Sequence, residues 1–495
     1  MPKTNDVQDQ TCGCGCNRRD FLSATAAGTG TLAFTALDAG GTESQPAVPT
    51  KEKAVVRAVF LYPPSSTFSE QENGWWSWPG NEFDAEGRQR QYTAALAEME
   101  KRLDVQIVVD RKPVANRADA ARLAAQVQAD RPEGLLLVMF YNRSLTDADL
   151  LLQAAEEAGI PTVFYIGLGV KHGSVVKYRR PGVYFIQSLD NLEAIEYGMR
   201  MFATKKRMGQ SRILSIVEAP EPREGKEQFF GTTVRVIPFA QYAELFDKVA
   251  VDDQMRQLIS QFTGGAREIR GVSREALENA ARAHFALREL LRREQADGVT
   301  MKCLQRGMLK PCMSFATLNS QLVPAACEND LSAAYTQLLG QSLTGRPGFQ
   351  HNPCFETERN HYYASHCTCA TKLAGPDGPD LPYLLRRFGH TNEGSCAIQV
   401  FWEPDTPVTM VRYYTGAEPE LDVYAGRVVK SHEMPPAGGC TTNVEIEITD
   451  RPDACMVRGH HNLLFSGDFA RKFRLFAQLY KIKLADTGFQ GIWPG

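Results

Sequence analysis

Short apolar runs alternate with amphipathic stretches over the part of the chain that follows residue 50. Four runs have the length and the Val, Ile and Leu content of buried strands: 54–62, 105–109, 134–140 and 162–166. Apolar positions at helical spacing fill the intervals between them, at 86–103, 117–130 and 146–158. This alternation predicts a parallel sheet with right-handed crossovers, in which ligands bind beyond the carboxyl ends of the strands.

A second α/β unit is predicted to begin at the apolar run 183–186. Its further elements are a helix at 190–204, strands at 212–217, 232–237 and 298–303, and a long helix that starts after Ser273. Ser273 is suited to cap that helix, because a serine side chain accepts a hydrogen bond from the first free amides. His284 lies on the apolar face of the same helix, so we interpret it as a histidine at the edge of the core.

The pattern changes after about residue 390. Short alternating stretches separated by Gly and Pro are typical of antiparallel strands in a small barrel, and they lie at 397–401, 409–414, 422–429 and 444–448. The predicted fold class is therefore α/β, with two Rossmann-like parallel-sheet domains followed by a β-rich, barrel-like C-terminal domain. The predicted boundaries are 1–49 for a leader and linker, then 50–182, 183–335 and 336–495.

The leader contains Arg18 and Arg19 followed by Phe21 and Leu22, and then a weakly apolar stretch rich in Gly and Ala. This order resembles a twin-arginine export signal, which implies a periplasmic protein that folds before export. The alternative is a tail with a chance pair of arginines. Disulfides are permitted outside the cytoplasm, but folding before export favours free, buried thiols.

Charge and hydropathy exclude several classes of protein. The chain has 55 Lys and Arg against 58 Asp and Glu, so its net charge of −3 offers no electrostatic basis for binding nucleic acid or anionic lipid. No apolar run approaches the roughly 18 residues that a membrane span needs. No glycine-rich loop suited to phosphate follows a predicted strand, which disfavours a nicotinamide dehydrogenase and predicts no organic cofactor.

The twelve cysteines fall into two groups. Cys12, Cys14 and Cys16 lie in the leader at a spacing that is tight for zinc, and the other nine lie between Cys303 and Cys455. Cys367 and Cys369 beside His366 could form a thiolate metal site or a nucleophile. The motif has no second cysteine pair at metal-ligand spacing, so packing beside a ligand is the simpler interpretation, as it is for Cys327.

Seven of the nine histidines follow residue 350, in a region that also contains several carboxylates. Two carboxylates and two histidines from separate segments could bind a hard or borderline divalent cation and leave coordination positions open. Adjacent residues of a strand face opposite ways, so only one of His460 and His461 is expected to reach such a site. The alternative is a set of unrelated surface and core histidines.

Residues from about 270 to 375 resemble the L-fucose isomerase-like family, which is related in architecture to L-arabinose isomerase. The resemblance rests on these segments: Pro324 to Asp330, Leu343 to Pro347, Asn352-Pro353, His366-Cys367, and the later Gly459 to His461 with Gly467-Asp468. It implies three domains and a divalent metal, commonly manganese, held by acidic residues and histidine near a subunit interface. The partners it implies are a monosaccharide and further copies of the chain, in a trimer or hexamer.

Carried over by motif, Glu328 and Glu356 match the acidic pair, and His366 and His461 match the metal-binding histidines. Glu358 is a rival to Glu356, and His460 is assigned to substrate binding. The resemblance implies an aldose–ketose isomerase that works through an enediol, with the two carboxylates as general acid and base.

Trp75, Trp76 and Trp78 lie in a long loop after the first strand and are expected to stack on a sugar face. The alternative function is a non-catalytic, exported carbohydrate-binding protein on the same fold.

Overall fold

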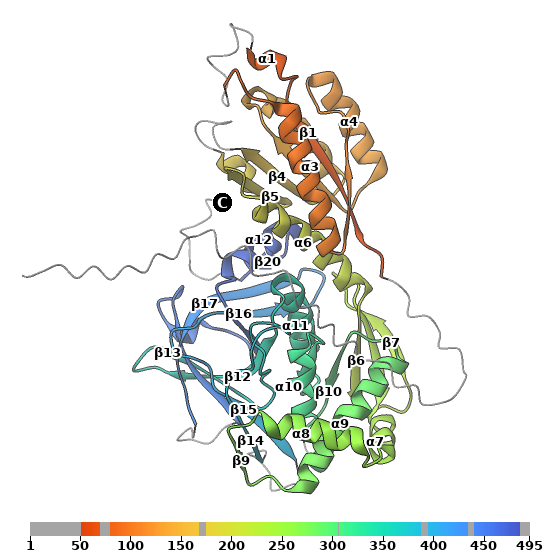
Figure 1. Cartoon of the computed structure of the whole chain (residues 1–495), viewed down its shortest axis with the longest axis vertical. Coiled ribbons are helices and arrows are strands. Elements are labelled where there is room, and N and C mark those ends of the chain that lie inside the picture. The colour runs from red at the N-terminus through yellow and green to blue at the C-terminus, as the bar shows by residue number, and fades with distance from the viewer. Residues whose placement is uncertain are drawn as a thin grey trace, which may run out of the picture. The chain divides into compact units, whose positions relative to one another are not determined.

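A computed structural model describes residues 51–69, 80–167, 175–304, 306–387, 395–433 and 440–485. All of these ranges belong to one compact unit, Thr50–Gly495 (Figure 1). The predicted leader and Trp75, Trp76 and Trp78 lie outside the described residues. Among the helices that are described, none combines the length and the apolar character needed to cross a membrane.

The first sheet is parallel, with the strand order β2-β1-β3-β4-β5. Its strands are β1 (Ala54–Leu61), β2 (Val105–Val109), β3 (Gly134–Met139), β4 (Thr162–Gly167) and β5 (Val183–Ser188). One face is covered by α3 (Ala85–Arg102) and α6 (Leu192–Gln210). The other is covered by α4 (Arg117–Asp130) and α5 (Leu145–Glu157), and the single turn α1 (Ser66–Ser69) follows β1.

The position of β5 corrects one sequence prediction. The run at 183–186 was expected to open the second unit, but β5 pairs in parallel with β4 and forms the edge of the first sheet. Its Val183 and Phe185 are buried in the core beneath α4 and α5. Helix α6, which follows β5, packs on the opposite face of that sheet. The elements of the first sheet therefore extend to Gln210.

The second sheet has the order β11-β10-β6-β8-β7, with β7 antiparallel at its edge and the other strands parallel. Its strands are β6 (Arg212–Val217), β7 (Arg223–Lys226), β8 (Thr233–Pro238), β10 (Gly298–Met301) and β11 (Ala325–Cys327). The helices of this region are α7 (Phe239–Lys248), α8 (Asp253–Gly264), α9 (Arg274–Arg293), α10 (Cys312–Ser320) and α11 (Leu331–Thr344).

Two predictions about α9 are confirmed. Oγ of Ser273 accepts a hydrogen bond of 3.1 Å from the Ala276 amide, which is the expected helix cap. His284 is 2% exposed, and its Nδ1 lies 3.1 Å from Oγ of Ser314. It is therefore a satisfied core histidine.

The predicted barrel is also confirmed, as a closed antiparallel barrel of six strands. The strands are β12 (Gly348–Glu356), β13 (His361–His366), β16 (Pro407–Tyr414), β17 (Glu420–Ser431), β18 (Thr442–Ile448) and β19 (Asn462–Ser466). The barrel closes because β16 pairs with both β17 and β19. The predicted strand at 397–401 is β15 (Cys396–Val400), which instead joins a separate sheet with β14 (Tyr383–Arg387) and β9 (Glu268–Arg270).

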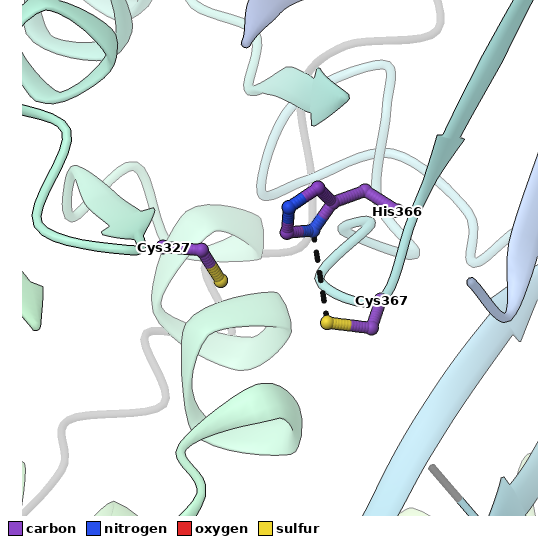
Figure 2. A group of neighbouring side chains, drawn as sticks. All are labelled: Cys327, His366 and Cys367. Carbon is purple, nitrogen blue, oxygen red and sulfur yellow. Dashed lines mark hydrogen bonds between the residues drawn. The ribbon is translucent and has the colours of Figure 1, made fainter. Parts of the chain in front are cut away.

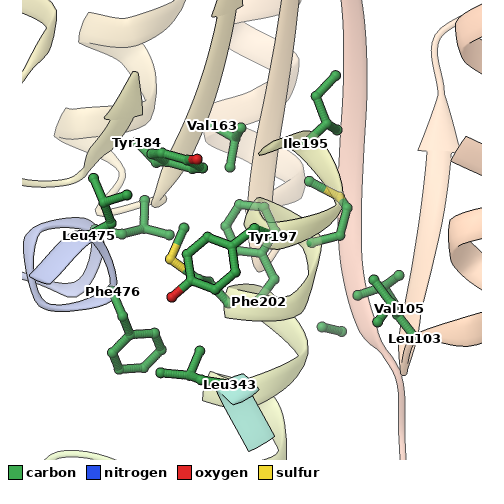
Figure 3. Packing of buried hydrophobic residues seen from close by; sticks show 14 of the residues in the cluster. Leu103, Val105, Val163, Tyr184, Ile195, Tyr197, Phe202, Leu343, Leu475 and Phe476 are labelled. Atoms are coloured by element: carbon green, nitrogen blue, oxygen red, sulfur yellow. The ribbon is translucent and has the colours of Figure 1, made fainter. Parts of the chain in front are cut away.

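The C-terminal helix α12 (Ala470–Tyr480) packs on the first sheet's side of the molecule, and the short β20 (Lys483–Leu484) then pairs with β17. Leu475 and Phe476 of α12 share a core cluster with Tyr197 and Phe202 of α6 (Figure 3). The Tyr197 hydroxyl also donates a 2.6 Å hydrogen bond to the Lys472 carbonyl. The apolar face of α12, which follows the last barrel strand, thus packs against α6 of the first sheet.

Four single 3₁₀ turns complete the described elements: η1 (Asn142–Ser144), η2 (Val176–Tyr178), η3 (Gly307–Leu309) and η4 (Ala454–Met456).

Helix α11 packs between the second sheet and the barrel. Gly340 permits the close approach, since a Cβ atom there would lie 2.0 Å from the ring of Phe465 on β19. The Gln337 side chain donates to the Gly348 carbonyl at 3.0 Å and so connects α11 to the start of β12. The carboxyl end of β11, immediately before α11, is thereby held against the barrel.

Candidate metal centre

Glu328 follows the last residue of β11, at the carboxyl edge of the second sheet. Glu328 and Asn329 have φ angles of 61° and 56°, a left-handed conformation that costs non-glycine residues about 1–2 kcal/mol each. Two contacts hold this turn: the Asn329 amide donates to the Met301 carbonyl at 3.0 Å, and Oγ of Ser215 donates to Oδ1 of Asn329 at 2.7 Å. Backbone strain of this kind is found at functional sites.

Two histidines from the barrel face the Glu328 carboxylate. His366 ends β13, and its Nε2 lies 3.7 Å from Oε1 of Glu328. His461 precedes β19, with its Nε2 3.4 Å from Oε2 of Glu328. The two imidazoles are 1% and 2% exposed, and their ring centroids are 5.5 Å apart. One ligand atom from each of Glu328, His366 and His461 lies within 4.8 Å of the others, so the three residues could hold a metal ion.

The buried nitrogens of this cluster support the same assignment. Nε2 of His366 and Nε2 of His461 make no hydrogen bond within the described part of the chain, although both atoms are buried. The same holds for Oδ1 of Asn352, which lines the cavity beside Glu328. Buried polar atoms are nearly always partnered, because an unpartnered one costs about 1–3 kcal/mol. A cation held by Glu328, His366 and His461 would satisfy the two imidazole nitrogens.

Asp330 orients His461. Its Oδ2 lies 3.0 Å from Nδ1 of His461, and it also accepts a 3.1 Å hydrogen bond from Nη1 of Arg412. An ionised carboxylate has no proton to donate, so in the neutral imidazole Nδ1 of His461 carries the hydrogen and Nε2 has its lone pair toward Glu328. Metal-binding histidines are commonly fixed by a carboxylate in this way.

The electrostatics of the cluster favour bound positive charge. His366 and His461 lower the pKa of Glu328 to about 2 and outweigh burial, which raises it. Burial lowers the pKa of His461, but Asp330 and Glu328 outweigh it and the net change is upward. Burial also lowers the pKa of His366, but Cys327 and Glu328 raise it by more, so the net change is upward. The site therefore presents an ionised carboxylate beside imidazoles whose surroundings stabilise a cation.

The structure does not bring Glu356 to this cluster. In the β12–β13 hairpin Asn352 lies opposite Ser365, beside His366, whereas Glu356 lies opposite His361 at the far end. Four residues of strand separate Asn352 from Glu356, which is about 13 Å. Glu356 and its rival Glu358 are both exposed. Among the residues described, the expected acidic pair is therefore not assembled, and Asn352 is the β12 residue that lines the same cavity as Glu328.

His460 and His461 precede β19, so strand alternation does not separate them, and both lie in a group with Asp330 that could hold a metal ion. His461 faces Glu328, while His460 is exposed and stacks on it with ring centroids 3.8 Å apart. Burial lowers the pKa of His460. His460 thus lies at the edge of the cluster, where the sequence places a substrate-binding residue.

A cavity of about 200 Å³ adjoins the cluster. Its lining joins Glu328, Asn352 and His366 to a set of cysteine and lysine side chains: Cys303, Lys310, Cys312, Cys367 and Cys440. Figure 2 shows Cys367 beside a ring nitrogen of His366, and Cys327 across from the ring on a separate segment. Cys369 is separate from this group and lies in the barrel core, with its Sγ 3.4 Å from the Ala370 carbonyl oxygen.

The sequence analysis does not assign Asp330, Asn352 or Cys327 to the site. Asp330 and Asn352 are part of the quoted motifs, and the short spacing from Glu328 to Asp330 was a usable signal for the former. Cys327 was interpreted only as a packing residue. Its convergence with His366 depends on contact between the second sheet and the barrel, for which the sequence has no local signal.

No protein-family model matches the chain, and no curated protein sequence matches it. The fold and site by themselves define an α/β protein with two sheets of predominantly parallel strands, a closed six-stranded barrel and groups of His, Cys, Asp and Glu residues that could hold a metal ion.

Proposed function

We propose that the protein is a metal-dependent aldose–ketose sugar isomerase whose metal is held by Glu328, His366 and His461. The convergence of these side chains, with two buried imidazole nitrogens that lack a partner in the described residues, is the observation that carries the proposal. Nitrogen and carboxylate donors suit Mn²⁺, which is the metal we propose, and three protein ligands leave positions for substrate oxygens. The resemblance to the L-fucose isomerase-like family supports the same activity.

Each side chain of the site has a separate role in the proposed reaction. A divalent ion would supply Lewis-acid stabilisation of the enediolate charge. Glu328, ionised at neutral pH, is the carboxylate placed to accept a proton from the substrate. Asp330 keeps Nε2 of His461 free to bind, and Asn352 offers its side-chain oxygen to a sugar hydroxyl. In this scheme a single carboxylate serves both stages of the proton transfer, because Glu356 lies at the other end of β12.

The distance of Glu356 from the cluster favours one second candidate. A non-catalytic, exported carbohydrate-binding protein would need the metal ligands and the cavity but no second acid–base group. The two candidates differ in turnover, whereas both require metal-dependent affinity for a sugar.

The deciding experiment is metal analysis of the purified protein, followed by a panel of aldoses monitored for ketose. We expect Mn²⁺-dependent ketose formation, with Glu328→Gln and His461→Ala each losing about 10²–10⁴-fold in turnover. Glu356→Gln and Glu358→Gln are the matched controls and should behave as wild type. Metal-dependent sugar binding without any ketose would select the binding protein, and no metal dependence of either property would reject both candidates.

Three further features belong to the same proposal: a monosaccharide substrate, a periplasmic location and a homo-oligomer of three or six chains. The family resemblance supports the oligomer, because it implies a metal site near a subunit interface. Sedimentation equilibrium of the purified protein tests it, and a monomer at all concentrations would contradict it.

A further inference from the structure

Five cysteines from five segments lie around His366 and the cavity that it lines. Cys327 ends β11, Cys312 begins α10 and Cys367 follows β13. Cys303 follows β10, and Cys440 precedes β18. Sγ of Cys312 donates a hydrogen bond to Sγ of Cys367, and both residues line one cavity with Cys303 and Cys440. None of the nine cysteines in the described ranges forms a disulfide.

Two distances within this group are close to the edge lengths of a metal tetrahedron. Two sulfurs bound to one tetrahedral ion at about 2.3 Å lie about 3.8 Å apart, and a sulfur and an imidazole nitrogen lie about 3.6 Å apart. Sγ of Cys312 is 3.6 Å from Sγ of Cys367, and Sγ of Cys367 is 3.6 Å from Nδ1 of His366. Ligand atoms of Cys327, His366 and Cys367 all lie within 4.8 Å of one another.

Two features beside the thiols would offset negative charge in a filled site. Cys312 is the first residue of α10, where the helix dipole stabilises negative charge. Lys310 is 4% exposed and lines the same cavity, with its Nζ donating to the Cys303 carbonyl at 3.3 Å. Three thiolates and one divalent ion carry a net charge of −1, which the Lys310 ammonium would balance. A buried site needs such compensation.

We propose that Cys312, Cys327, Cys367 and Nδ1 of His366 form a second metal site, which binds zinc. A tetrahedral set of three sulfurs and one nitrogen is the donor set that zinc prefers. Each thiol loses its proton to solvent when the ion binds. This site shares His366 with the carboxylate–histidine cluster but takes its other donors from thiols, and it does not depend on isomerase activity.

His366 joins the two sites. Its Nε2 lies 3.7 Å from Oε1 of Glu328. Its Nδ1 faces Cys367 (Figure 2). When both sites are filled, the ring binds a metal at each nitrogen and gives up both ring protons. Zinc on the thiol side would then fix the orientation of the ring toward Glu328.

The test uses the reduced full chain, stripped of metal with a chelator and loaded with Zn²⁺ or Co²⁺. X-ray absorption of the Zn²⁺ form should show sulfur neighbours at about 2.3 Å. The Co²⁺ form should show thiolate-to-cobalt charge-transfer absorption. Cys327→Ser and Cys367→Ser should abolish that absorption, and Cys312→Ser should weaken Co²⁺ binding about tenfold or more.

The controls separate this site from the carboxylate–histidine cluster and from misfolding. Cys354→Ser changes an exposed thiol and Cys369→Ser a buried one outside the group, and both should retain the absorption. Glu328→Gln should also retain it, even if the proposed isomerase activity fails. The wild-type X-ray absorption measurement does not depend on any variant. Only nitrogen and oxygen neighbours around zinc, or a disulfide between Cys312 and Cys367 in the purified protein, would overturn the proposal.

Discussion

Nδ1 of His461 lies 3.0 Å from Oδ2 of Asp330, and the same aspartate caps α11 by accepting a 2.8 Å hydrogen bond from the Ala333 amide. One carboxylate therefore ends the turn that contains Glu328 and also orients the histidine opposite it. Arg412 completes the arrangement, since its Nη1 donates both to Asp330 and to the His461 carbonyl. Asp330 thus connects the turn that contains Glu328 to the ring of His461, so a change at either ligand is expected to disturb the other.

Asp330→Asn should separate these two roles of the aspartate. Asparagine caps helices as well as aspartate does, so the free energy of unfolding should fall only through the weaker pairing with Arg412, by about 1–3 kcal/mol. The neutral amide holds the His461 tautomer poorly, and metal affinity should fall about 10–100-fold. Isothermal titration with Mn²⁺ measures the affinity, and chemical denaturation measures the stability. Wild-type Mn²⁺ affinity in this variant would show that Asp330 does not orient a ligand.

Gly459→Ala should displace His461. Gly459 has a φ of 90°, and a Cβ atom there would lie 2.3 Å from the Tyr414 hydroxyl. We expect a loss of about 1–3 kcal/mol in the free energy of unfolding, together with loss of Mn²⁺ binding. Gly271→Ala is the matched control, because Gly271 has a φ of 65° with no atom near the added Cβ. Gly271→Ala has only the cost of a positive φ at an alanine, so it should bind Mn²⁺ as wild type does. Equal loss of Mn²⁺ binding in both variants would refute a steric effect on His461.

Glu445 should make stability depend on pH in the acidic range. Its buried carboxylate lies 2.8 Å from Nδ1 of His361 and 2.7 Å from Nε2 of His432. Burial raises the pKa of Glu445, but the two histidines outweigh it and the net change is downward. The unfolded chain therefore takes up this proton at a higher pH than the folded chain. The resulting stability is present above the unfolded pKa of about 4.3 and is lost as the pH falls through the lower folded pKa.

Glu445→Gln removes this contribution. The free energy of unfolding should fall by about 1–3 kcal/mol at neutral pH, and its decline between neutral and acidic pH should be shallower than in wild type. Urea denaturation at a series of pH values measures both quantities, and Glu356→Gln is the exposed control. Parallel pH profiles for wild type and Glu445→Gln would contradict the assignment.

Export should depend on the arginine pair of the leader. Arg18→Lys combined with Arg19→Lys preserves the charge and should trap the full-length protein in the cytoplasm. Cell fractionation followed by immunoblotting measures the distribution. Unchanged export of the double variant would remove the basis for the proposed periplasmic location.

The local elements could be predicted because their causes are local. The predicted helix 117–130 coincides with α4, and the predicted start after Ser273 coincides with α9. Apolar periodicity and capping side chains act within a few residues, so they can be read along the chain. The residue types of Glu328, His366 and His461 were also available, because short motifs surround them.

Tertiary structure alone decided three other features. Parallel pairing places β5 in the first sheet, and no sequence signal near Val183 specifies its partner strand. Asn352 and Glu356 lie on the same face of β12, so only the contact between the barrel and the second sheet decides which of them lies beside Glu328. The thiols of Cys312, Cys327 and Cys367 come from separate elements, and their approach to His366 is a long-range consequence of packing. The sequence determined which chemical groups were present, whereas the packing of the second sheet against the barrel determined which of them meet.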